Sequence, residues 1–323
     1  MTDAPGARPV GFIGLGAMGG PMAANVLKRF PVIAYDVVPE RLAAAVAAGA
    51  EAASGPGEVA DRADRVITML PGSPAVEAVY LGSDGLVAHA RPGQIFIDMT
   101  TCHPATTRKV GAALAARGAE LLDAPVARTR EAARQGTLAI MVGGSEATLE
   151  ACRDLLATMG TDIAHCGPLG TGEVVKLVNN LILFNTVACL AECLPLAQWH
   201  GVAPARLVEI LSRGSAASFA LANHVGQAVL AGDFAPGKFS VAYALKDADY
   251  ALALAEEAGV PLYHGALTKA RLQEAAARGL ADHYYPVLFT LTESLLGVAF
   301  RRDAPGGPPP DPAAAHGGAG AIP

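Results

Sequence analysis

The first half of the chain alternates short apolar runs with longer stretches of helical spacing. The apolar runs, which we expect to be strands, cover residues 9–16, 31–36, 65–70, 94–99, 119–126 and 137–144. Between them, apolar residues repeat every three or four positions and predict helices over residues 18–29, 39–49, 56–62, 74–80, 104–117 and 145–159. Strands that alternate with helices predict an α/β fold, with a mostly parallel, doubly wound sheet covered by helices on both faces.

The pattern changes near residue 167, after which no further strand is predicted. Successive helical stretches follow as far as residue 298. We therefore expect two domains, at residues 1–166 and 167–298, of which the second is all-α and begins with an unusually long helix. Residues 299–323 are rich in Pro, Gly and Ala and predict a disordered tail.

The long helix expected at residues 174–199 is strongly apolar, and its length would suit a membrane span. Polar side chains interrupt it at Lys176, Asn179, Asn180, Asn185 and Glu192. We therefore expect a helix of a soluble protein, largely buried and without contact to a membrane.

Composition narrows the choice of ligand. Of the 323 residues, 52% are hydrophobic and 17% are charged, as in ordinary globular chains, and the formal net charge is −6. A net-acidic chain argues against nucleic acid as a partner, because nucleic-acid binding needs a clustered basic face. Any basic site must be local, which suits a small anionic ligand.

Cysteine and histidine usage bears on the compartment and on metals. The chain has five cysteines, an odd number without a Cys-x-x-Cys pair, and no signal peptide is visible. This pattern predicts reduced thiols in a cytoplasmic protein. The eight histidines are scattered and form no cluster with metal-ligand spacing, so no metal site is expected.

A glycine-rich turn directly follows the first predicted strand and opens the first predicted helix. Gly14, Gly16 and Gly19 have the G-x-G-x-x-G spacing, with Ala17 and Met18 between the last two. The first glycine permits a tight turn, the second lets a pyrophosphate approach the backbone, and the third lets helix and strand pack closely. Because a helix N-terminus offers N–H groups to anions, this turn predicts a dinucleotide-binding site.

An acidic residue, Asp36, ends the second predicted strand. A carboxylate there accepts hydrogen bonds from the adenosine ribose and repels a 2′-phosphate, and the two valines that follow supply no arginine to hold one. The pattern therefore predicts NAD rather than NADP. Leu70 and Pro71, at the end of a later strand, are expected to lie over the cofactor at the carboxyl edge of the sheet.

A lysine and an asparagine, Lys176 and Asn180, lie four residues apart in the long helix and so share one face. Apolar neighbours leave little of this helix for solvent, and a buried lysine is costly unless a partner compensates it. A desolvated lysine beside another cation loses its proton more easily than one in water. The pair therefore predicts a site at which Lys176 transfers a proton.

Four segments together resemble the β-hydroxyacid dehydrogenases, the family of 3-hydroxyisobutyrate dehydrogenase and tartronate semialdehyde reductase. They are, in order, GFIGLGAMGGPMA, DMTTCHPATTRK, DAPVARTREAARQGTLAIMVGG and GTGEVVKLVNN. A fifth segment, ALKDADYALALA, is similar to the family's later Lys-Asp segment through Lys246 and Asp247. The resemblance covers about residues 9–297.

The resemblance implies a Rossmann domain followed by an all-α domain on a long connecting helix, in a homodimer or homotetramer. It implies that Lys176 is the catalytic lysine and Asn180 its partner. It also implies that Thr101 lies on the nicotinamide side and Lys246 near the cofactor and substrate. The expected reaction is hydride transfer between nicotinamide and a short anionic 3-hydroxy acid or semialdehyde.

The loop after DAPV departs from most members of this family, which continue Ser-Gly-Gly and hold the substrate carboxylate there. This chain has Ala127, Arg128 and Thr129 instead. With CHPATT, the loop resembles that of the sulfolactaldehyde reductases within the family, which implies that Arg128 grips the substrate's anionic group through paired hydrogen bonds. The alternative for Arg128 is a structural salt bridge. Arg130 and Arg134 are expected to be surface charges.

Several alternatives stay open. The substrate could be sulfolactaldehyde-like, 3-hydroxyisobutyrate, tartronate semialdehyde or succinic semialdehyde. An imine reductase and a non-catalytic nucleotide-binding module would share the architecture, but such relatives usually lack the lysine, so Lys176 counts against both. Cys102 and His103 flank Thr101 and are expected to pack or to orient their neighbours rather than to react.

Overall fold

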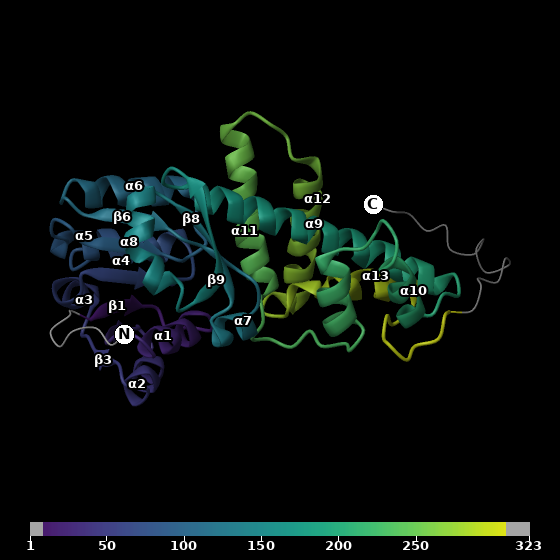
Figure 1. The fold of residues 1–323 in the computed structure, drawn as a ribbon. Coiled ribbons are helices and arrows are strands. Elements are labelled where there is room, and N and C mark those ends of the chain that lie inside the picture. Colours follow the sequence, from purple (N-terminus) through teal and green to yellow (C-terminus); the bar gives the residue numbers. More distant parts are fainter. Residues whose placement is uncertain (1–8, 308–323) are drawn as a thin grey trace. The chain divides into compact units, whose positions relative to one another are not determined.

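The structure is a computed structural model and describes residues 9–307. It divides into two compact units, Met1–Val178 and Asn179–Pro323. The division falls inside one long helix, α9 (Thr171–Trp199), whereas the change from strands to helices falls at the start of that helix. The first unit contains a sheet with helices on both sides, and the second consists of helices (Figure 1).

The sheet of the first unit has nine strands, which are β1 (Val10–Ile13), β2 (Val32–Tyr35), β3 (Glu51–Ala52), β4 (Arg65–Thr68), β5 (Ile95–Asp98), β6 (Glu120–Asp123), β7 (Val126–Ala127), β8 (Leu138–Gly143) and β9 (Gly160–Gly167). Their order is β3-β2-β1-β4-β5-β6-β8-β7, with β9 paired to β8. Pairing is parallel from β3 to β6 and between β8 and β9, and antiparallel where β8 meets β6 and β7. The predicted mostly parallel sheet is confirmed, with a strand at each of the six predicted runs.

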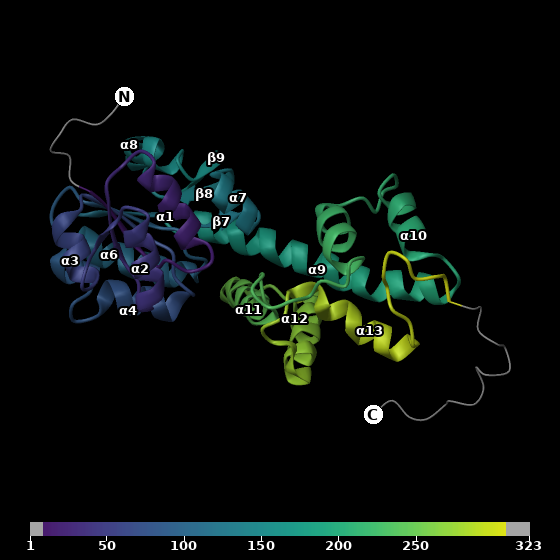
Figure 2. The ribbon, with the colours of Figure 1, turned by 90° about the horizontal axis from the view of Figure 1, so that it is seen from below.

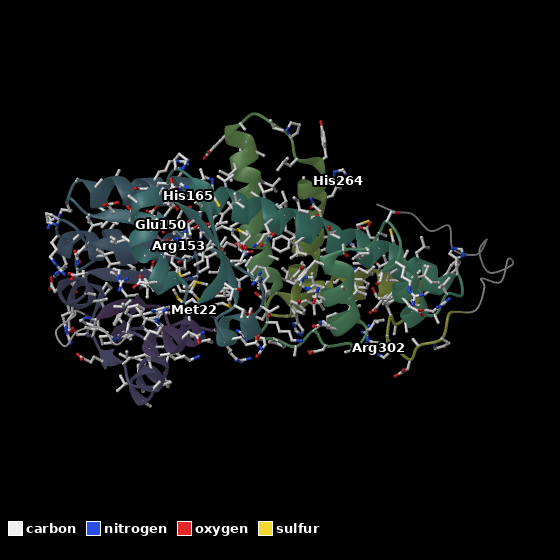
Figure 3. The ribbon with its side chains drawn as sticks, in the orientation of Figure 1. Met22, Glu150, Arg153, His165, His264 and Arg302 are labelled. Carbon is white, nitrogen blue, oxygen red and sulfur yellow. The ribbon has the colours of Figure 1, made fainter. Side chains whose placement is uncertain are left out.

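Eight helices accompany this sheet, namely α1 (Gly19–Leu27), α2 (Pro39–Ala47), α3 (Pro56–Arg62), α4 (Ser73–Leu81), α5 (Leu86–His89), α6 (Pro104–Ala115), α7 (Arg130–Gln135) and α8 (Glu146–Leu156). They form two separate apolar cores with the strands. One core contains side chains of α1, α7 and α8, including the fully buried Met22 (labelled in Figure 3). The other contains side chains of α3 to α6, including Tyr80. Because each face of the sheet has its own core, both faces are covered as predicted.

Five elements of the first unit were not predicted: β3, β7, β9, α5 and α7. Helix α7 lies in the loop after DAPV, for which no helix was predicted. Thr129 caps it, since its hydroxyl accepts a hydrogen bond from the Ala132 N–H at 3.3 Å, and Gly136 ends it in the left-handed region at φ +68°. Strand β9 is mostly exposed, so its sequence carries few of the apolar residues on which a strand prediction depends.

The second unit contains α10 (Pro204–Leu211), the π-helix η1 (Ala220–Val229), α11 (Val241–Glu257), α12 (Tyr263–Ala275), the short π-helical turn η2 (Ala276–Leu280), the 3-10 turn η3 (Tyr285–Leu288) and α13 (Phe289–Leu296). The second half of α9, a single continuous helix, belongs to it as well (Figure 2). The predicted all-α region built on a long first helix is confirmed.

Helix α9 is less buried than its composition predicts. By length and composition alone it could cross a membrane, and 44% of its most apolar window is buried within the structure. Leu177 is fully buried, but Val178 is 50% and Ile182 is 62% exposed. The expectation of a largely buried helix is therefore wrong for one of its faces, because an apolar side chain does not reveal whether its own chain covers it.

The expected disorder of residues 299–323 is wrong for the part that the structure describes. Phe300 is fully buried, and its backbone N–H donates a hydrogen bond to Glu293 at 2.7 Å. Arg301 pairs with the same carboxylate at 2.7 Å. Residues 299–307 therefore pack onto the second unit, and residues 308–323 lie outside the described part of the chain.

Candidate active site

The glycine-rich turn after β1 has the local geometry of a phosphate-binding turn. Gly14 has φ +92°, and a Cβ on it would overlap the Met69 carbonyl oxygen. A Cβ on Gly19, the first residue of α1, would overlap the Gly14 carbonyl oxygen. A Cβ on Gly16 would instead meet nothing nearer than an Arg41 nitrogen at 3.8 Å. Two glycines are thus required by the protein's own packing, and one keeps a surface open.

That open surface lies at the start of α1, where Met18 is the N-cap and Ala17 is exposed. Within the described residues no side chain caps this helix, and no acid occupies its first turn. Its first N–H groups and the positive end of its dipole are therefore suited to an anion. The residues present fit the pyrophosphate of a dinucleotide.

Asp36, just after β2, is held against this turn. Its carboxylate accepts hydrogen bonds from the Leu15 and Val38 backbone N–H groups at 2.6 and 2.8 Å, and the residue is 8% exposed. Arg41 of α2 places a guanidinium nitrogen 3.8 Å from the same carboxylate, with its side chain 52% exposed. Arg41 was not among the predicted site residues, because only the two valines directly follow Asp36 and it is helix α2 that brings Arg41 back beside the turn. The choice between NAD and NADP thus involves one acid and one arginine.

Two further loops leave the sheet at the same edge, because β4 is paired in parallel with both β1 and β5. Leu70 and Pro71 follow β4, and the Leu70 N–H donates a hydrogen bond to the Thr100 hydroxyl at 2.9 Å. Thr101 follows β5 and is half-buried. These predicted cofactor contacts therefore lie at the carboxyl edge, where open α/β sheets bind their ligands.

Asp123, the last residue of β6, fixes the start of α9 and was missed by the sequence analysis. Its buried carboxylate accepts hydrogen bonds from the backbone N–H groups of Gly170 and Glu173 at 2.7 and 2.9 Å. An acid at a helix N-terminus satisfies otherwise unpaired donors and complements the helix dipole. Lys176, in the next turn of α9, is only 8% exposed. The hydrogen bonds of Asp123 thus tie the first turn of α9, and with it the backbone of Lys176, to the carboxyl edge of the sheet.

Asp247 of α11 brings together two predicted site residues of the second unit. Its carboxylate accepts a hydrogen bond from the Asn180 side-chain amide at 2.7 Å and lies 2.8 Å from the Lys246 ammonium. Asp247 and Asn180 are 2% and 4% exposed, so this contact is buried. Asp247 belongs to a predicted motif but was assigned no role from the sequence. Its role as the link between α9 and α11 requires the tertiary structure.

Arg128 follows β7 and has φ +86°, a backbone conformation that favours glycine. Its guanidinium donates hydrogen bonds to the Thr137 carbonyl at 2.5 Å and the Thr161 hydroxyl at 3.3 Å, and lies 3.5 Å from Asp162. The structure therefore contains the salt bridge that was the alternative interpretation. The side chain is nevertheless 42% exposed, and its role towards a substrate stays a prediction.

The other residues of this loop have simpler surroundings. Ala127 ends β7, and Thr129 serves as the N-cap of α7. Arg134 pairs with Glu131 across one turn of α7 at 3.3 Å, with both side chains more than half exposed, so it is a surface charge. Arg130, the first residue of α7, is half-buried.

Three reactive-looking side chains have structural surroundings. Cys102 is fully buried. His103 is the N-cap of α6, where its ring accepts a hydrogen bond from the Ala105 N–H at 3.2 Å. His165 of β9, labelled in Figure 3, has its ring nitrogen 2.9 Å from the Gly144 carbonyl. Among residues 9–307, no group of three or more His, Cys, Asp or Glu side chains is arranged to hold a metal ion.

Comparison with known proteins gives two family matches that divide the chain near the start of α9. Residues 9–167 match the NAD binding domain of 6-phosphogluconate dehydrogenase. Residues 170–286 match the NAD-binding family of NADP-dependent 3-hydroxyisobutyrate dehydrogenase.

Three relatives resemble the chain over most of its length. The 2-(hydroxymethyl)glutarate dehydrogenase of Eubacterium barkeri is 38% identical, over 90% of this chain and 96% of its own. The 3-hydroxyisobutyrate dehydrogenase of Pseudomonas aeruginosa is 39% identical, over 88% and 95%. A solved structure of Mycobacterium tuberculosis 3-hydroxyisobutyrate dehydrogenase with L-serine is 31% identical, with a TM-score of 0.81 over 88% and 99%.

The dinucleotide turn, the buried lysine and these matches together define a nicotinamide-dependent oxidoreductase that acts on CH–OH groups. The chain belongs to the β-hydroxyacid dehydrogenase family, as its sequence motifs predicted.

Proposed function

We propose that the protein is an NAD-dependent dehydrogenase or reductase for a short anionic 3-hydroxy acid or the corresponding semialdehyde. One observation carries this proposal: Lys176 is buried two turns or less from a helix start that Asp123 holds at the carboxyl edge of the dinucleotide-binding sheet. A cation buried beside a cofactor edge is suited to proton transfer, since desolvation makes its proton easier to release.

The proposed chemistry separates hydride from proton. A bound nicotinamide supplies or accepts the hydride at the carbinol carbon. Lys176 gives a proton to the carbonyl oxygen during reduction, or takes it from the hydroxyl during oxidation. Asn180, one turn later on α9 and held by Asp247, orients the substrate oxygen and the lysine.

The proposal that the protein uses NAD rests on Asp36. Arg41 acts in the opposite direction, because its guanidinium could bind the 2′-phosphate of NADP. We expect the protein to use NAD in preference to NADP, because a 2′-phosphate beside the Asp36 carboxylate is repelled. Asp36→Asn keeps an oxygen for the local N–H groups and removes the charge. It should raise the NADP-to-NAD ratio of kcat/KM by about tenfold or more, since adjacent like charges cost on the order of 1–4 kcal/mol.

Arg41→Gln is the companion variant to Asp36→Asn, because it removes the cation instead of the acid. It should lower whatever NADP activity the protein and the Asp36→Asn variant have, because it removes the cation beside the phosphate position. Steady-state kinetics with both cofactors measure these ratios. A parent protein that prefers NADP, and loses that preference in Arg41→Gln, would show that the arginine prevails over the acid.

The relatives support an anionic substrate, since 3-hydroxyisobutyrate and 2-(hydroxymethyl)glutarate both carry carboxylates. Arg128 supports either a sulfonate or a carboxylate, because a guanidinium pairs with both. We propose that a bound substrate engages the exposed part of this guanidinium while Asp162 and the Thr137 carbonyl hold the rest.

Arg128→Ala tests the substrate class. With aldehydes bearing a sulfonate, a carboxylate or no charge, we expect KM to rise for the two anionic substrates and to stay unchanged for the uncharged one. Consumption of NADH gives the rates. Thermal stability should change little, because the lost ion pair is exposed. Arg134→Ala removes an equally charged side chain from the same loop and serves as the control. Equal effects of Arg128→Ala on all three substrates would make the arginine purely structural.

We also propose a cytoplasmic homo-oligomer, a dimer or a tetramer. All five cysteines are free thiols, which supports a reducing compartment. Val178 and Ile182 expose apolar surface on α9, which supports an interface with a second copy.

A further inference from the structure

Three acids and a thiol are buried together where α9 begins, and none of them takes part in the proposed transfer of hydride and proton. Asp98 ends β5, Cys102 follows it in the next loop, Asp123 ends β6 and Glu173 lies in the first turn of α9. All four residues are between 0% and 2% exposed. All four belong to the first unit, so their arrangement depends on that unit alone.

Two of the acids have the hydrogen bonds of carboxylates. Asp123 accepts the backbone N–H groups at the start of α9, as described above. Asp98 accepts hydrogen bonds from the Thr68 hydroxyl at 2.9 Å and the Thr100 N–H at 3.1 Å. Both can carry their charge in place, since several donors point at each.

Glu173 is different. Its Oε1 accepts a hydrogen bond from the Cys102 thiol at 3.4 Å, and its carboxyl also accepts the Cys102 backbone N–H. Its Oε2 is buried without a hydrogen-bond partner among the described residues. Neither Cys102 group is a cation. A carboxylate in this position would be charged, desolvated and half-unsatisfied, which is far costlier than an uncharged acid.

Burial and the surrounding charges also favour the uncharged form of Glu173. Burial raises the pKa of Glu173 well above its ordinary value, and the nearby Asp98 and Asp123 carboxyls raise it further. Burial also raises the pKa of Asp98 to about 6 and that of the Cys102 thiol well above its ordinary value. Helix α6 carries two cations, Arg108, whose guanidinium lies near Gly170, and Lys109, which pairs with Glu77. Lys176 lies one turn further along α9.

We propose that Glu173 is a positioning residue for Lys176: as an uncharged acid it joins the first turn of α9 to the segment after β5, and its ionisation opens that contact and displaces the lysine. An ionised Glu173 would face two carboxylates without a donor for Oε2. Moving the first turn of α9 away relieves the repulsion. Lys176 is three residues further along the same helix and moves with that turn.

The first test is the pH dependence of Glu173→Gln, which keeps the shape and cannot ionise. Glu146→Gln is the matched control, because Glu146 is an exposed acid in the first turn of α8. Rates are measured for oxidation of 3-hydroxyisobutyrate with NAD, since in this direction deprotonation of Lys176 does not itself reduce the rate. We expect kcat of the parent and of Glu146→Gln to fall on the alkaline side. In Glu173→Gln the same fall in kcat should occur at a pH that is higher by about one unit or more, with KM for NAD unchanged.

Stability gives a readout that does not depend on the proposed function. The folded-state pKa of Glu173 is raised, so the folded protein binds the proton more tightly than the unfolded chain does. The contribution of this group is therefore full below its unfolded pKa, near 4.5, and is lost as pH rises through its folded pKa. The melting temperature of Glu173→Gln should exceed that of the parent by an amount that grows with pH, while Glu146→Gln should follow the parent.

Amide hydrogen exchange of the unaltered protein covers the case in which Glu173→Gln does not fold. After correction for the intrinsic effect of pH, protection in the first two turns of α9 should fall on the alkaline side while protection in α8 persists. Identical pH profiles of parent and Glu173→Gln, or unchanged protection in α9, would overturn the proposal. If no hydroxy acid is oxidised but the melting and exchange results hold, the proposed function fails and the positioning role stands.

Discussion

Replacing Lys176 by alanine should abolish turnover and leave cofactor binding intact. General acid–base catalysis contributes about 10²–10⁴-fold to a rate, so a loss of kcat of this size is expected in both directions. The glycine-rich turn that would hold the dinucleotide lies in a different segment, after β1. Affinity for NADH, measured by titration of its fluorescence, should therefore stay close to that of the parent protein.

Lys176→Met distinguishes loss of the ammonium from loss of the buried side chain, since methionine fills similar space without charge. Both variants should be inactive, and Lys176→Met should be the more stable, because alanine leaves a cavity at a position that is 8% exposed. Lys269→Ala is the control, a partly exposed lysine of α12 paired with Asp249 at 2.6 Å. Near-normal turnover in either Lys176 variant would refute the assignment of the proton to this lysine.

Alanine at Gly16 and at Gly19 should separate cofactor binding from folding. At Gly16 the added Cβ meets only the flexible end of Arg41 at 3.8 Å, so stability should be unchanged. The methyl group would nevertheless occupy the surface that a pyrophosphate approaches, and NADH affinity should fall by about tenfold or more. At Gly19 the Cβ overlaps the Gly14 backbone carbonyl, so stability and NADH affinity should both fall.

Thermal unfolding and NADH titration measure the two quantities separately. A Gly16→Ala variant that binds NADH as tightly as the parent would place the pyrophosphate elsewhere. Gly49→Ala is a useful comparison, because Gly49 has φ +108° without any atom within 4 Å of its Cβ position. It should cost stability through the backbone alone and leave NADH affinity unchanged.

The elements of this fold were predictable where the chain itself carries the cause. The apolar run at Val10–Ile13 is buried, and Gly19 is required by its contact with the nearby Gly14 carbonyl. Lys176 and Asn180 were predictable because helical spacing fixes their relation. Helix α7 could have been predicted as well, since Thr129 and Gly136 are ordinary start and stop signals.

What the sequence could not supply were contacts between segments far apart in the chain. Asp247 meets Asn180 across 67 positions, and Asp123 meets the Glu173 N–H across 50. No local pattern marks either acid as a partner, because each is a common residue at a strand end or on a helix. Arg128 shows the same limit: its charge was visible, but its ion pair with Asp162 depends on the neighbouring strand β9, which was not predicted.

The backbone of Arg128 has a further consequence. At φ +86° an L-residue with a side chain is strained by about 1–2 kcal/mol relative to a conformation it prefers, and glycine would occupy the same place without this penalty. A chain optimised for folding alone would therefore carry glycine here. If Arg128 holds the substrate's anionic group, as we propose, this position sets ligand binding against stability, and a substrate without an anionic group would favour glycine here.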